Sequence, residues 1–88
     1  MNKKELQEVR IELVNNIEKY HREYRKHRQK VIKLRNCMYK ALKYNKEQAE
    51  AYGFTVRQHM LIADAVREEA KIMSSRLLYL FELERKAS

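Results

Sequence analysis

The sequence predicts an all-α protein: a long antiparallel helical hairpin that dimerises into a four-helix bundle. The 88 residues contain no Pro and only one Gly. Lys, Arg, Glu, Gln, Leu, Met and Ala dominate, and these residues favour helix almost everywhere. Apolar residues also recur at intervals of three and four positions over most of the chain, which is the period of one helix face.

The first helix is expected over about residues 3–52. It begins near Asn2, with Glu5 in its opening turn, where the helix dipole favours a carboxylate. Two columns of residues spaced by seven follow and predict a packing seam. They are Leu6, Leu13, Tyr20, His27 and Leu34 in one column and Ile17, Tyr24, Val31 and Met38 in the other. Beyond these columns the seam is expected to drift to Leu42, Ala49 and Tyr52.

A turn is predicted at residues 53–55. Gly53 is the only glycine, and a glycine adopts a left-handed helix cap without steric cost. Thr55 and Gln58 fit a capping box that would restart the chain as a second helix. Because the connection is short, the two helices are expected to form an antiparallel hairpin within one domain spanning residues 1–88.

The second helix is expected over about residues 56–85. Its two seam columns are Val56, Ala63, Ala70 and Leu77, and His59, Val66, Met73 and Leu80. Further apolar residues spread around its C-terminal half, so one neighbouring helix cannot cover them all. With a turn at 53–55, the aliphatic residues between Leu6 and Ile17 would also extend beyond the end of the second helix.

These two uncovered regions predict a homodimer in which two hairpins pack as a four-helix bundle. The alternative is a break at Asn15 and Asn16, with the first segment folding back to give a three-helix monomer. The absence of Gly and Pro at that point argues against the break.

Positive charge is concentrated in residues 19–46, which contain eleven Lys or Arg side chains and one carboxylate, Glu23. The rest of the chain is nearly neutral, so this segment accounts for the net charge of +8. On a helix, two columns of this segment form a line about 36 Å long that contains no acid. We call this line the basic stripe: Lys19, Arg22, Lys26, Gln29, Lys33, Asn36, Lys40 and Lys43.

A stripe of this kind predicts a DNA-binding or RNA-binding protein that recognises mainly backbone or shape, because Lys side chains neutralise phosphates without reading sequence. Arg25 and Arg28 flank the stripe and widen the positive surface, while Gln29 and Asn36 are the side chains suited to contacting base edges. The alternative is an adaptor or inhibitor whose basic face docks on an acidic protein, such as a nucleic-acid-processing enzyme. The sequence does not distinguish DNA from RNA.

No catalytic constellation is predicted, and neither a cofactor, a metal nor a small-molecule substrate is expected. Glu18 and His21 have the spacing used in di-iron bundles, but both fall outside the seam. Cys37 is the only cysteine, and it is expected to be a small half-buried residue. The longest apolar run, residues 77–81, is far shorter than the roughly 20 residues of a membrane span. A cytoplasmic protein without a membrane partner is expected.

Overall fold

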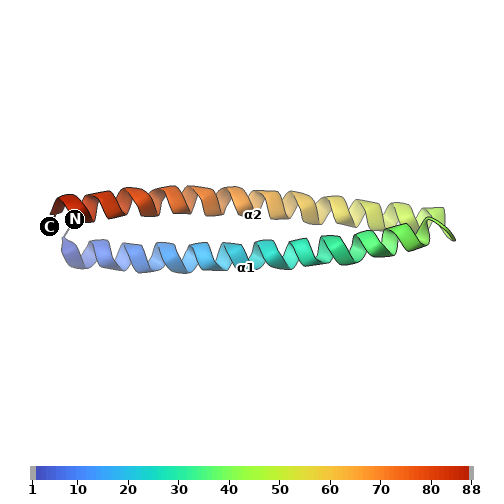
Figure 1. The fold of residues 1–88 in the computed structure, drawn as a ribbon, viewed down its shortest axis with the longest axis horizontal. Coiled ribbons are helices and arrows are strands. Elements are labelled where there is room, and N and C mark those ends of the chain that lie inside the picture. The colour runs from blue at the N-terminus through green and yellow to red at the C-terminus, as the bar shows by residue number, and fades with distance from the viewer. Residues whose placement is uncertain (1, 88) are drawn as a thin grey trace.

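The computed structural model describes residues 2–87 and is an antiparallel hairpin of two long helices (Figure 1). Helix α1 spans Lys3–Ala41 and helix α2 spans Lys46–Ala87. The hairpin measures 65 × 14 × 13 Å, so it is a rod only one helix pair wide. The predicted all-α hairpin is confirmed. The alternative break at Asn15 and Asn16 is absent, because α1 runs through both residues without interruption.

Helix α1 begins where the sequence predicted. Asn2 is its N-cap, with an extended backbone at φ −81° and ψ 169°. The side-chain oxygen of Asn2 accepts a hydrogen bond from the backbone N–H of Glu5 at 2.8 Å. This bond satisfies one of the N–H groups that have no partner within the first turn of a helix.

The turn lies at residues 42–45, so the predicted turn at 53–55 is wrong. Tyr44 and Asn45 each donate a backbone hydrogen bond to the carbonyl of Ala41, at 3.0 and 2.7 Å. The Asn45 side chain then accepts from the backbone N–H of Gln48 at 3.2 Å and caps α2. No described residue has a positive φ angle. The turn therefore needs no glycine, and Gly53 is an interior residue of α2.

The predicted helix boundaries change accordingly. The first helix ends at residue 41 instead of 52, and the second begins at residue 46 instead of 56. Thr55 caps no helix; its hydroxyl donates to the carbonyl of Ala51, one turn earlier in α2. Leu42 is 57% exposed in the turn and does not continue the α1 seam. Ala49 is buried, but it packs from α2.

The core follows the heptad columns that the sequence predicted for both helices. All nine predicted seam residues of α1 and all eight of α2 are buried or half-buried. The columns also extend to the turn, through Ala41 on α1 and Ala49 on α2, because the helices stay paired up to that point. The fully buried set is small: Leu6, Val31, Ala41, Ala49, Val56, Ala63, Ala70 and Leu80.

The observed turn pairs other segments of the two helices than a turn at 53–55 would pair. The helices have nearly equal lengths of 39 and 42 residues, so the N-terminal third of α1 packs along the C-terminal third of α2. Arg10 and Glu84 form an ion pair across this end at 3.3 Å, and Leu13 and Leu80 line the same interhelical groove. The region from Leu6 to Ile17 thus lies beside α2 within the chain, with Ile11 and Val14 still 55% and 36% exposed. The dimer stays a prediction.

Within residues 2–87, no helix contains an apolar stretch long enough to cross a membrane.

Candidate nucleic-acid interface

The basic stripe lies on the exposed surface of α1, outside the seam that packs against α2. Seven of its members belong to the helix, and Lys43 lies in the turn. From residue 19 to residue 40 the helical part extends about 32 Å at 1.5 Å per residue. All ten predicted site residues are exposed: Lys19, Arg22, Arg25, Lys26, Arg28, Gln29, Lys33, Asn36, Lys40 and Lys43.

The charged side chains of the stripe are not neutralised by neighbours. The ion pairs found among the described residues involve other groups: Arg10 with Glu84, Lys71 with Glu68, and His27 with Glu23. None of the ten site residues forms a side-chain hydrogen bond within the described part of the chain. Their ammonium, guanidinium and amide groups are therefore available to an external ligand.

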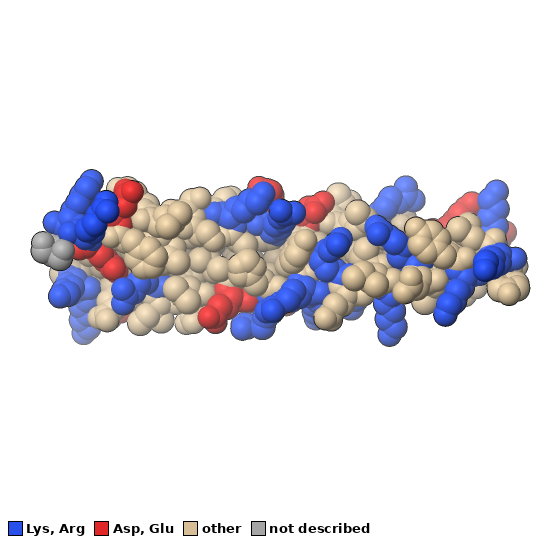
Figure 2. Space-filling model, in the orientation of Figure 1, with Lys and Arg blue, Asp and Glu red and all other residues tan. Residues whose placement is uncertain are grey.

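Helix α2 leaves most of this charge uncompensated. The part of α2 that runs beside the stripe, residues 47–71, has three basic and five acidic side chains, against a net charge of +10 in residues 19–46. The two ends of the rod consequently differ. The half that contains the turn carries essentially the whole net charge, and the half with the chain ends is balanced. On the face shown in Figure 2, Lys and Arg outnumber Asp and Glu in the turn-containing half.

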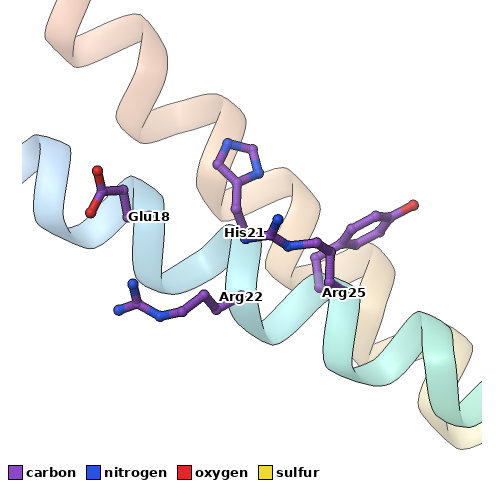
Figure 3. Close-up of a pocket in the computed structure, with 5 residues that line it drawn as sticks. Glu18, His21, Arg22 and Arg25 are labelled. Atoms are coloured by element: carbon purple, nitrogen blue, oxygen red, sulfur yellow. The ribbon is translucent and has the colours of Figure 1, made fainter.

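A second group of cations lies at one edge of the interhelical groove, and the sequence reasoning missed it. His21 and Tyr24 of α1 line a shallow cleft there with Arg67 and Lys71 of α2. Figure 3 shows His21 together with Glu18, Arg22 and Arg25, which project from neighbouring turns of α1. A turn at 53–55 would pair α1 with other residues of α2 than the observed turn does. The position of Arg67 and Lys71 beside His21 could therefore not be predicted from the sequence.

Two histidines meet inside the hairpin. Nδ1 of His27 and Nδ1 of His59 are 2.9 Å apart, and the rings are tilted by 36°. At this distance one ring nitrogen donates its hydrogen to the lone pair of the other, so at least one imidazole is neutral. The pKa of His59 is lowered by desolvation and by repulsion from His27 and Lys30. The pair is a polar contact between the two helices. The sequence predicted His27 in the seam of the first helix and His59 in the seam of the second.

The remaining candidates are the thiol of Cys37 and the side chains of Glu18 and His21. Cys37 is a free, half-buried thiol. Glu18 and His21 are both exposed, and His21 lines the interhelical cleft rather than pointing away from α2. Residues 2–87 contain no cluster of three or more His, Cys, Asp or Glu side chains that could hold a metal ion.

Comparison of the chain with protein-family models, with curated proteins and with solved structures finds no match.

Proposed function

We propose that the protein is a non-enzymatic nucleic-acid-binding protein whose basic stripe contacts the phosphate backbone of DNA or RNA. One observation carries the proposal. The stripe is a line of exposed cations and amides about 32 Å long on one helix, and it makes no ion pair with the described residues of its own chain. A straight array of Lys and Arg suits a polyanion with regularly spaced charges, because each phosphate contact releases a bound counterion.

The stripe is better suited to backbone contacts than to sequence readout. Its length is close to one helical turn of B-DNA, which is roughly 34–36 Å. Only Gln29 and Asn36 have side chains that pair with base edges in defined geometry, and both are surrounded by lysines. We expect affinity to depend strongly on salt and only weakly on sequence. A cytoplasmic location suits such a protein and stays a prediction.

The proposal is tested by titrating fluorescent duplex DNA, single-stranded DNA and RNA with the protein. If the stripe neutralises four to six phosphates, the slope of log affinity against log salt concentration should be roughly −4 to −5. Lys26, Lys33 and Lys40 are each separated by seven residues, about 10.5 Å along α1. Changing all three to Glu should reduce affinity at about 50 mM salt by more than tenfold, with the helix content unchanged because all three are exposed.

The matched control changes Lys3, Lys4 and Lys86 to Glu. These side chains are also exposed, and the substitution alters net charge equally, but they lie at the balanced end of the rod. This variant should retain most of the affinity. Equal weakening by both triple variants would show a diffuse polycation without a defined site. Absence of binding to all three nucleic acids, together with retention of one acidic protein by the wild type but not by the stripe variant, would favour the alternative adaptor function.

A further inference from the structure

Helix α2 carries a second apolar line that α1 does not cover. Three large side chains on it are exposed: Ile62 and Ile72 by 44% each and Tyr79 by 64%. They belong to two heptad columns that we call the outer seam, and the exposed Phe54 and Leu61 directly precede two of its members, Thr55 and Ile62. The outer seam consists of Ala51, Thr55, Gln58, Ile62, Ala65, Glu69, Ile72, Arg76, Tyr79 and Leu83. At 3.6 residues per turn its centre lies about 100° around α2 from the seam that faces α1.

Two seams at this angle are expected of a helix that packs against two neighbours, as each helix does in a four-helix bundle. The hairpin supplies only one neighbour. Helix α1 has no comparable outer seam on the same side of the hairpin, because the corresponding positions hold mainly charged residues such as Glu12, Lys19, Lys26 and Lys33. A second helix should therefore pack against α2.

The exposed area also points to a missing neighbour. The hairpin exposes 7151 Å² at a mass of 10.8 kDa. A compact monomer of this mass exposes about 5500 Å², so the excess is about 1600 Å². A stable protein–protein interface buries about 800 Å² on each partner, and obligate dimers bury more. An interface of standard size along α2 would remove about half of the excess.

The outer seam is complementary to itself when two copies run antiparallel. A two-fold axis at the level of residue 67 places small residues against large ones and isoleucine against isoleucine. The opposed pairs are Ala51 with Leu83, Thr55 with Tyr79, Gln58 with Arg76, Ile62 with Ile72, and Ala65 with Glu69. Each of these pairs occurs twice in the dimer, as an isologous interface requires.

The same axis pairs opposite charges on α1. The outward column beside the interhelical groove reads Glu5, Glu12, Lys19, Lys26, Lys33 and Lys40. On α2, the seam that faces α1 and the outer seam point in different directions. A two-fold axis perpendicular to the plane of the two α2 helices therefore keeps both α1 helices on the same side of that plane. The axis then sets Glu5 at the level of Lys40 of the second copy, and Glu12 at the level of Lys33. Only the central lysines, Lys19 and Lys26, face like charges.

We propose that a second copy of this chain docks antiparallel on the outer seam of α2, with the two-fold axis at the level of residue 67. The dimer predicted from the sequence used two regions, Leu6 to Ile17 and the C-terminal half of the second helix. The proposed interface keeps Ile72, Tyr79 and Leu83 of the second region and adds residues nearer the middle of α2.

The dimer does not require the proposed function of the basic stripe. It brings the two stripes together on one face, with Lys26, Lys33 and Lys40 beside the second copy and the outward members, including Arg22 and Gln29, exposed. The mass of the Lys26, Lys33 and Lys40 variant in solution must therefore be measured before its affinity for nucleic acid is compared with that of the wild type.

The mass in solution provides the first test. At micromolar concentration the wild type should scatter light as a dimer of twice 10.8 kDa. Ile62→Lys with Ile72→Lys should weaken dimerisation more than tenfold. The matched control, Ile32→Lys with Leu78→Lys, adds the same charge at apolar residues that are 56% and 66% exposed outside the seam, and it should remain dimeric. Should the Ile62 and Ile72 lysine variant fail to fold, the corresponding alanine variant should show a raised dissociation constant by sedimentation.

The orientation provides the second test, by pulsed electron paramagnetic resonance on spin-labelled single cysteines in a Cys37→Ala background. A label at Glu68→Cys, close to the axis, should give an interchain distance below about 30 Å, whereas Glu47→Cys should give about 60 Å from the 1.5 Å rise. A folded monomer would overturn the proposal. Dissociation by the control pair but not by the seam pair, or short distances at both labels, would equally overturn it.

Discussion

Replacing Gly53 by Ala tests the position of the turn directly. Gly53 lies in the interior of α2, eight residues after the N-cap Asn45. A glycine there loses more backbone freedom on folding than any other residue, and Ala is the best helix former. If Gly53 instead formed a left-handed cap at the end of a helix, Ala would cost about 1–2 kcal/mol. The two structures therefore predict opposite signs for one substitution.

The expected size of the effect follows from the surroundings of Gly53. In a helix interior the exchange of Gly for Ala gains about 1 kcal/mol. The new methyl group would lie 3.4 Å from Sδ of Met38, which is the nearest atom across the interhelical contact. This contact is at the close edge of ordinary van der Waals distance, and the flexible Met side chain can adjust at little cost. For a chain of this size 1 kcal/mol raises Tm by about 4–8 °C.

The assay is thermal unfolding followed by circular dichroism, at one protein concentration because a dimer makes Tm depend on concentration. Asn45→Ala is the companion variant: it removes the α2 cap and should cost about 1 kcal/mol. A lower Tm for Gly53→Ala, with an unchanged Tm for Asn45→Ala, would refute the turn at residues 42–45. That outcome would instead support the turn predicted at residues 53–55.

Two further predictions concern the core. Val31 is fully buried, so Val31→Ala should cost about 2 kcal/mol in urea unfolding, whereas Ile32→Ala, at a 56% exposed neighbour, should cost less than half as much. The lowered pKa of His59 means that the folded state binds fewer protons than the unfolded state. Its stabilising contribution is therefore present above the ordinary pKa of 6.5 and is lost as the pH falls through and below that value. The Tm should fall on acidification, and His59→Leu should reduce this fall; an unchanged pH profile in that variant would exclude protonation of His59 as the cause.

The amino-acid sequence by itself determined the helices, their buried faces and the charged surface. These features depend on local preference and on the period of apolar residues along one helix, which need no knowledge of the partner. Val31 and His27 were assigned to the seam of α1, and Ala63 and Leu80 to that of α2, and all four are buried or half-buried there. The stripe was likewise visible because charges on one helix face are fixed by spacing alone.

The position of the turn was decided only by tertiary structure. Gly53 is a stronger local signal than the segment from Leu42 to Asn45, but the seams of both helices continue past the real turn through Ala41 and Ala49. Pairing at residue 45 lets the aliphatic end of α1 bury against the C-terminal third of α2, and that long-range gain outweighs the cost of about 1 kcal/mol for a glycine inside a helix. The register in turn decided that Arg67 and Lys71 lie beside His21, and that Ile62, Ile72 and Tyr79 of α2 stay exposed.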